Sequence, residues 1–354
     1  MSQHPYKSQP DRAFWSRSVS RDFVPWHVPA VTVPLLRHDD HIVSAGSCFA
    51  SNVIPWLASG GLHYVTLETP HPAFEFLGEN LGYRNFSAAY GNIYSARQLR
   101  QLLDRACGLF HPVEDRWRVG QTVVDPFRPG LRHPATSDRE FDLLTAQHLA
   151  AVREAFATAT VVLLTLGLTE GWVSLADGAV FPACPGTIAG EYDPAKHGFH
   201  NFTAAEVRED LVAFIAQLRS INPVCRVIIT VSPVPLVATA TDQHVLVATT
   251  YSKAVLRVAA GEVAEALDEV VYFPAYELVT GPQASGAYYA EDRREVTPEG
   301  VSVVMNALMA NSMVHAPEGT PLAAPVVTAA PPTIESELSR RIAEAECDEV
   351  LADR

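Results

Sequence analysis

The sequence predicts an α/β fold: a three-layer α/β/α sandwich around a five-stranded parallel sheet, in the flavodoxin-like strand order 2-1-3-4-5. Three observations predict it. Short β-branched runs alternate with longer segments of helical periodicity. The clearest run, TVVLLTL at 160–166, is apolar at nearly every position, as a strand buried on both faces requires. Right-handed crossovers between such strands place helices on both faces of the sheet.

Composition limits the class of protein. The chain has 354 residues, of which 48% are hydrophobic and 19% charged, as in soluble globular proteins with a sizeable core. A formal charge of −14 argues against a nucleic acid or an anionic membrane as partner. The five scattered cysteines show no CxxC spacing, so we expect neither a disulfide framework nor a zinc site. No His and carboxylate cluster has ligand spacing either, and we expect no metal and no cofactor. No apolar run is long enough to span a bilayer, and we expect a cytoplasmic protein.

The first strand and the turn after it organise the chain. Residues 42–45 are small or β-branched, and Gly46 permits a sharp turn into a helix. Ser47 is a suitable cap for that helix, and Cys48 falls in its first turn, where free amides and the helix dipole stabilise a thiolate. The alternative is structural, because free cysteines are usually small core residues and serines at such positions are usually only caps.

The other elements follow in chain order. Strands are expected at 63–67, 160–166, 226–231 and 270–273, with 276–279 extending the last strand. Helices are expected at 96–107, 138–157, 203–222 and 245–269, and a last one begins at Thr297-Pro298-Glu299. A small hairpin at 115–127 is expected outside the main sheet.

The chain divides into three parts by composition. Residues 1–33 are rich in proline and aromatics, and we expect an arm that packs on the core. One α/β domain is expected at 34–315, with insertions at 71–135 and 173–200. Residues 316–354 read as a flexible Ala- and Pro-rich linker followed by a charged helix.

Several strand-end motifs resemble one family. They are GSCFA at 46–50, YGNIYS at 90–95, TLGLTE at 165–170, SPVPL at 232–236 and YFPAYEL at 272–278. Together they resemble the GSCFA-domain family, relatives of the SGNH (GDSL-like) hydrolases, over roughly residues 5–313. The resemblance implies the same sandwich and acyl-ester chemistry. Overlaid on the GDSL block, Cys48 stands at the nucleophile, and a shift by one residue would put Ser47 there instead.

The resemblance also implies an oxyanion hole. Gly91 is the expected backbone donor and Asn92 a possible side-chain donor. The structural alternative for this pair is a turn glycine capped by the asparagine, without a role in catalysis. Thr169 stands where the superfamily has an asparagine, and its hydroxyl is a shorter donor. Glu170 and Trp172, like Thr169, follow the strand expected at 160–166, and they could line the pocket.

The final motif departs from the superfamily pattern. After the fourth strand, Ser232 could contact substrate. The Asp-x-x-His of SGNH enzymes is here Asp292-Arg293-Arg294-Glu295, so Glu295 occupies the histidine position. Four interpretations stay open: Glu295 is the base, a histidine from elsewhere replaces it, a thiolate needs no strong base, or the site is no longer hydrolytic.

Of the thirteen histidines, His200 is the main candidate for a replacement base, with His71 and His244 behind it. The favoured function is an acyl hydrolase or acyltransferase that acts through Cys48 on an O-acylated glycan or a related small metabolite. The alternative is a noncatalytic glycan- or partner-binding module that has lost its catalytic base. The oligomeric state stays open.

Overall fold

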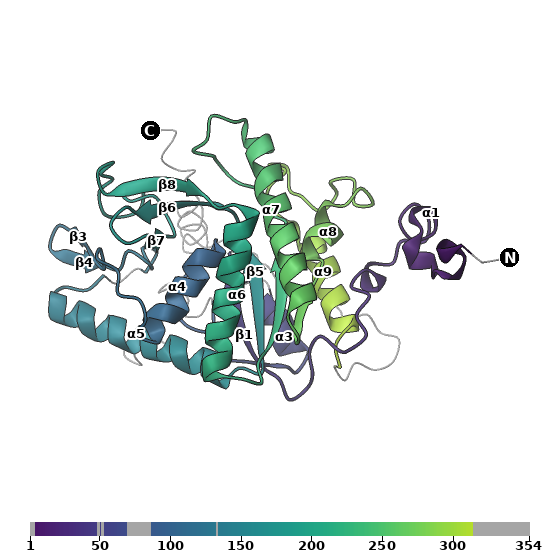
Figure 1. Cartoon of the computed structure of the whole chain (residues 1–354), viewed down its shortest axis with the longest axis horizontal. Coiled ribbons are helices and arrows are strands. Elements are labelled where there is room, and N and C mark those ends of the chain that lie inside the picture. The colour runs from purple at the N-terminus through teal and green to yellow at the C-terminus, as the bar shows by residue number, and fades with distance from the viewer. Residues whose placement is uncertain (1–3, 48–49, 51–52, 69–85, 132–133, 314–354) are drawn as a thin grey trace.

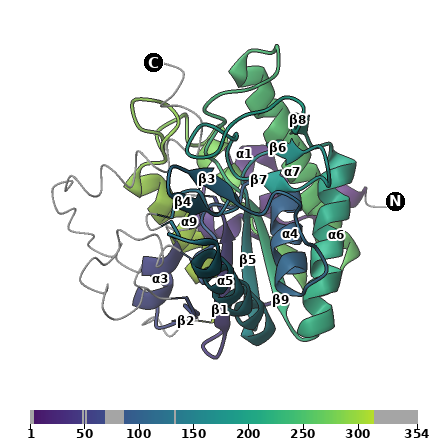
Figure 2. The same ribbon diagram turned by 90° about the vertical axis from the view of Figure 1, so that its left-hand side faces the viewer.

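The computed structural model describes residues 4–47, 50, 53–68, 86–131 and 134–313. Its main sheet, of which Figure 1 labels β1 and β5, is fully parallel and has the order β2-β1-β5-β9-β10, which confirms the expected order 2-1-3-4-5. Figure 2 shows β2, β1, β5 and β9 in this order. The strands are β1 His41–Gly46, β2 His63–Tyr64, β5 Val161–Leu166, β9 Arg226–Val231 and β10 Val270–Tyr272. All six residues of β5 are buried at the centre of the sheet, as its apolar sequence predicts.

Helices cover both faces of this sheet, so the molecule has the expected three layers (Figure 2). Alternate residues of β1 point to opposite faces: Val43 and Ala45 join one apolar cluster, and Ile42 joins the other. The first face packs on α4 Ala96–Ala106, α5 Asp138–Thr158, α6 Ala204–Ile221 and α7 Val245–Ala266. The second packs on α3 Val53–Ser59, α8 Ala275–Thr280 and α9 Pro298–Ala310.

Two small antiparallel sheets lie outside the main one (Figure 1). The hairpin expected at 115–127 is confirmed as β3 Trp117–Val119 and β4 Thr122–Val124. The insertion after β5 builds a three-stranded sheet in the order β7-β6-β8, from β6 Glu170–Ser174, β7 Val180–Phe181 and β8 His197–Asn201. The segment at 173–200 is therefore a folded sheet beside the strand ends rather than an irregular loop.

One expected strand is wrong. Residues 276–279 do not extend the fifth strand but form part of α8. Pro274 ends the strand, and both Leu278 and Val279 are buried, against the second face of the sheet and α9. Two buried residues next to each other in sequence are typical of a helix that packs against two neighbouring elements. A half-buried strand would instead alternate buried and exposed residues.

The chain before β1 has two different parts. Phe23, Val28 and Val31 pack against the second apolar cluster, so this stretch covers the core. The preceding 3₁₀ helices Pro5–Ser8 and Asp11–Ala13 and the short α1 Trp15–Ser18 contain no buried residue and project from the body (Figure 1). The expected linker and helix at 316–354 lie outside the described residues. Within the described part of the chain, no helix could cross a membrane.

Candidate active site

The turn after β1 brings a buried hydroxyl to the carboxyl end of the sheet. Gly46 ends the strand with φ +157°, and a Cβ there would lie 2.6 Å from the Thr165 carbonyl oxygen of β5, so only glycine allows this approach. Ser47 follows and is 4% exposed. Among the described residues its Oγ has no hydrogen-bond partner. Cys48, the expected nucleophile, lies outside the described residues.

Backbone hydrogen bonds join three strand-end loops around this turn. Ile93 N donates to the Gly46 carbonyl at 2.9 Å. The carbonyl of Tyr94 accepts from Gly167 N at 3.0 Å and from Leu168 N at 3.1 Å. The loops after β1 and β5 are therefore both fixed to the segment that contains YGNIYS. The amides of Gly167 and Leu168 point at Tyr94, so they are already engaged.

Two buried residues of α7 hold the loop after β5 from behind. Lys253 is 2% exposed and its Nζ donates to the Gly167 carbonyl at 2.6 Å. Ser252 Oγ accepts from Thr169 N at 3.0 Å. The Thr169 hydroxyl donates to Asn201 Oδ1 at 2.7 Å, and Thr169 is not among the residues that line the cavity described next. Its expected oxyanion role stays a prediction without support from this geometry.

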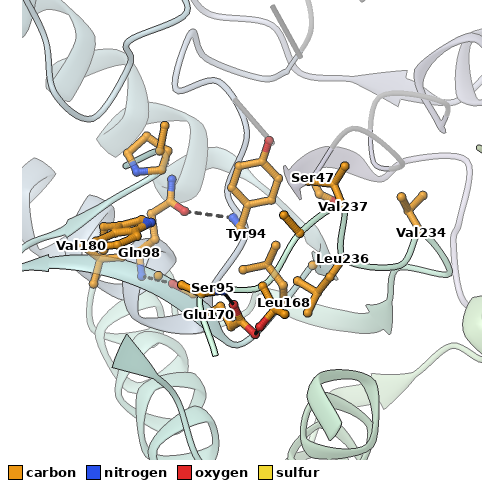
Figure 3. Close-up of a pocket in the computed structure, with 18 of the residues that line it drawn as sticks. Ser47, Tyr94, Ser95, Gln98, Leu168, Glu170, Val180, Val234, Leu236 and Val237 are labelled. Atoms are coloured by element: carbon orange, nitrogen blue, oxygen red, sulfur yellow. Dashed lines mark hydrogen bonds between the residues drawn. The ribbon is translucent and has the colours of Figure 1, made fainter. Parts of the chain in front are cut away.

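A cavity of about 200 Å³ opens beside Ser47 (Figure 3). Its walls come from the ends of β1, β5 and β9, the start of α4 with the two residues before it, and the small sheet of the insertion. Most of the lining is apolar, including Leu168, Trp172, Val180, Phe181, Phe199 and Leu236. Four of the expected site residues line it: Ser47, Glu170, Trp172 and Ser232.

Glu170 and Trp172 have structural partners in the cavity wall. The carboxylate of Glu170 accepts from Thr239 Oγ1 at 2.7 Å and from Ala240 N at 3.2 Å, which ties the loop after β9 across the opening. Trp172 packs edge-on against Tyr192 and Phe199, with ring centroids 5.4 and 5.8 Å apart. Glu170 therefore shapes the cavity, and Trp172 offers it an aromatic wall.

Other expected residues lie around the cavity with local roles. Ser232 is 1% exposed and lines it, and its Oγ accepts from Val234 N at 3.2 Å. Gly91 has φ +67° and is a turn glycine. The carbonyl of Asn92 accepts from Gln98 Nε2 at 2.9 Å. Neither Gly91 nor Asn92 is among the lining residues, so their expected donor roles stay predictions.

The segment before α9 presents an arginine to the cavity where the resemblance implies a base. Asp292 Oδ1 accepts from the amides of Arg294 and Glu295 at 2.9 and 3.0 Å, and Arg293 between them has φ +57°. This turn places Arg294 in the cavity wall and leaves Glu295 exposed to solvent. Glu295 has no contact with the cavity that would favour its expected role as base, and Asp292 stabilises the turn.

His200 also lies away from the cavity. Its Nε2 is 2.8 Å from Glu206 Oε1 at the start of α6. Burial alone would raise the pKa of Glu206, but hydrogen bonds from Thr203 and His200 outweigh it and lower that pKa. His244 is exposed and caps α7, and His71 lies outside the described residues. No histidine is found among the described residues that line the cavity.

The lining residues that were not singled out from the sequence include the polar side chains of Tyr94, Gln98 and Arg294. Gln98 Oε1 accepts from Tyr94 N at 2.9 Å, and Ser95 Oγ accepts from Gln98 N as the helix cap (Figure 3). A serine at position 95, directly before a helical pattern, predicts a helix cap. That cap places Gln98 in the first turn of α4, where its side chain contacts Tyr94 in the preceding loop. Arg294 had no comparable signal, because its orientation depends on the turn before α9.

No cluster of three or more potential metal ligands occurs in the described part of the chain. Two solved structures are similar to this chain at a low level: a serine-to-alanine mutant of an acetyl esterase with an acetate ion, and a carbohydrate esterase family 3 protein from Talaromyces cellulolyticus. Each is 10% identical and covers 76% of this chain, with TM-scores of 0.33 and 0.32 over 93% and 92% of its own length. Similarity at this level assigns no function.

Among curated proteins no relative matches the chain. The family comparison gives a different result. The model of the GSCFA family matches residues 41–308, from the first residue of β1 to the last helix of the core, and so includes every strand-end loop of the site. The chain therefore belongs to the GSCFA family.

Proposed function

We propose that the protein is an SGNH-like acyl-ester hydrolase whose nucleophile lies in the Ser47-Cys48 turn. The observation that carries the proposal is the buried hydroxyl of Ser47, which faces a cavity and has no partner among the described residues. Buried polar groups are nearly always hydrogen-bonded, and an exception at a strand end indicates a group reserved for a ligand. A substrate carbonyl would supply the missing partner.

Cys48 is the attacking residue in this proposal, and Ser47 is the alternative. A serine needs a base within hydrogen-bond reach, and Ser47 has no partner among the described residues. A thiol ionises unaided at a pKa of about 8.5, and a nearby guanidinium favours the thiolate. Arg294, in the wall of the cavity that Ser47 also lines, is the proposed source of that positive charge.

The reaction then has two steps. The thiolate of Cys48 attacks the ester carbonyl, the carbon–sulfur bond forms, and the alkoxide leaves with a proton taken from water. Water attacks the thioester in the second step and releases the carboxylic acid and the thiol. An acceptor hydroxyl in place of water would make the same site an acyltransferase. An O-acylated glycan or a related small metabolite is the proposed substrate class.

The test is to trap the acyl-enzyme. The protein is incubated with p-nitrophenyl acetate, quenched in acid and analysed by peptide mass spectrometry. We expect an acetyl group on Cys48, a burst of nitrophenol, and loss of both in Cys48→Ala. Cys107→Ala is the matched control, because Cys107 is a half-buried cysteine at the end of α4, outside the cavity lining. A label on Ser47 would transfer the role to serine, and turnover without any label would refute covalent catalysis.

A second candidate function is a binding module that has lost catalysis. The specific observation in its favour is that no histidine occurs among the described residues of the cavity wall. Binding of acylated oligosaccharides with equal affinity by wild type and Cys48→Ala, with no turnover by wild type, would establish it. Loss of turnover but not of binding in Cys48→Ala supports the hydrolase instead.

A further inference from the structure

We infer that the cavity beside Ser47 binds the acyl half of the substrate and that this acyl group is an apolar chain of about six carbons or a ring of similar size. The inference rests on the proposed function, and it names the substrate class of that same site. An acetyl group alone would leave most of the cavity empty. The argument starts from the polar side chains of the lining.

Most polar side chains in the cavity wall already have partners within the protein. Glu170 accepts from Thr239 and Ala240, and Ser232 accepts from Val234. The Gln98 amide is engaged at both ends, by Tyr94 N and by the Asn92 carbonyl. Ser47 alone among the described lining residues has a buried hydroxyl without a partner. The guanidinium of Arg294 also lines the cavity. The polar requirement of the cavity therefore lies at the Ser47 turn and at Arg294, and little of it lies elsewhere.

The rest of the wall is apolar and extends away from the turn. In Figure 3, Tyr94 lies between Val180 and Ser47, and Val234 lies beyond Ser47 on the other side. Val180 is 2% exposed and belongs to the small sheet of the insertion. An ester carbonyl at Ser47 would therefore direct one half of the substrate along an apolar wall toward Val180.

The size of the space sets the length of that half. An apolar cavity of about 150 Å³ is large enough to bind benzene, and this one is about 200 Å³. Because a water-sized group takes up about 30 Å³ of liquid, the space corresponds to roughly six or seven heavy atoms. A hexanoyl or benzoyl group fits this volume.

The acyl half, rather than the alcohol half, belongs in this space. A sugar or other polyhydroxylated alcohol would bury several hydroxyl groups against a wall whose polar side chains are mostly engaged, and each unpaired hydroxyl is costly. An alkyl or aromatic acyl group gains free energy from the same burial. The leaving alcohol then stays at the open side, where water also enters to complete the reaction.

The experiment compares two isomeric esters, ethyl hexanoate and hexyl acetate, which have the same atoms and differ only in which half is apolar. We expect kcat/KM for ethyl hexanoate to exceed that for hexyl acetate by roughly 250-fold, because its acyl half has four more methylenes and each buried methylene gives about a fourfold gain. In a p-nitrophenyl ester series, activity should rise to about six carbons and then fall. A preference for hexyl acetate, or a maximum at acetyl, would overturn the inference.

Variants at the far end of the cavity test the position of the chain. Val180→Phe should lower the ratio of hexanoyl to acetyl turnover at least tenfold, and Val180→Ala should move the optimum to longer chains. Val224→Phe is the matched control: Val224 is 78% exposed and precedes β9, at the opposite end of the sheet. Should Val180→Phe fail to fold by circular dichroism, the Val180→Ala shift decides.

A binding measurement separates this inference from the proposed function. Calorimetric titration with hexanoate and with acetate needs no catalysis. Hexanoate binding that is weakened in Val180→Phe, in a protein without esterase activity, would sustain the cavity assignment and refute the hydrolase. Esterase activity with no difference between hexanoate and acetate, and no effect of either Val180 variant, would leave the hydrolase and refute the cavity assignment.

Discussion

Acidification from pH 7 to pH 5 should destabilise the protein through one buried histidine. His148 on α5 is fully buried, and its Nδ1 lies 2.6 Å from Glu68 Oε2. Burial lowers the pKa of His148 from 6.5 to about 4, and the positive charge of Arg128 adds to this effect, while Glu68 and Asp125 only partly offset it. The imidazole is therefore neutral in the folded protein at pH 5, whereas in the unfolded chain it is charged.

The sign and size of the effect follow from this difference. Between pH 6.5 and 4 the unfolded chain binds a proton that the folded protein does not, so the free energy of unfolding falls as the pH falls. Two protonation equilibria with pKa values of 6.5 and about 4 give a loss of about 2 kcal/mol from pH 7 to pH 5, approaching about 3 kcal/mol at pH 4. The lowered pKa of Glu68 causes a loss in the same direction only below its ordinary value of 4.5.

The assay is urea denaturation followed by circular dichroism at pH 7, 6 and 5. His148→Gln removes the titrating group, and we expect its free energy of unfolding to change by less than about 0.7 kcal/mol over this range, one third of the wild-type loss. His111→Gln, at an exposed histidine, is the control and should follow wild type. Equal stability of wild type at pH 7 and 5, or an unchanged pH dependence in His148→Gln, would refute the reasoning.

Three further substitutions test the fold by the same denaturation assay. Gly46→Ala would set a Cβ 2.6 Å from the Thr165 carbonyl, and it should cost about 1–3 kcal/mol; an unchanged midpoint would show that β1 can move. Asp40→Asn leaves the largely buried guanidinium of Arg226 without its carboxylate at 2.5 Å and should cost roughly 3 kcal/mol, whereas a loss below about 1 kcal/mol would mean water replaces it. Thr203→Ala removes a capping box and should cost about 1 kcal/mol, with Thr203→Ser close to wild type.

The sheet could be predicted from the sequence because its central strands are apolar throughout. An apolar run such as 161–166 has few alternatives to a buried strand. Right-handed crossovers restrict the possible strand orders, and 2-1-3-4-5 is the simplest of them and also the order that the family resemblance implies. Prediction was weaker where runs were short. The strand expected at 63–67 is paired only at His63 and Tyr64, and the segment at 276–279 is helical. Four apolar residues carry too little periodicity to separate strand from helix.

The candidate site was predictable only in part. Residues directly after a strand, such as Ser47 and Ser232, reach the cavity because the strand end fixes their position. Two other candidates do not follow this rule. Thr169, assigned by overlay on the superfamily pattern, donates its hydroxyl hydrogen bond to Asn201. His200, the candidate replacement base, pairs with Glu206. Both contacts involve β8 of the small sheet or the start of α6, which follows it. No local pattern in the sequence encodes that packing.

The turn before α9 bears on which residue is the nucleophile, because its described residues place an arginine and no histidine in the cavity wall. With Arg293 at φ +57° and Asp292 accepting from the next two amides, the turn presents Arg294 to the cavity and Glu295 to solvent. A positive group cannot take a proton from a serine, but it does stabilise a thiolate. In the proposed hydrolase, an arginine in the cavity wall favours a nucleophile that ionises by itself, and Cys48 would meet this requirement where Ser47 would not.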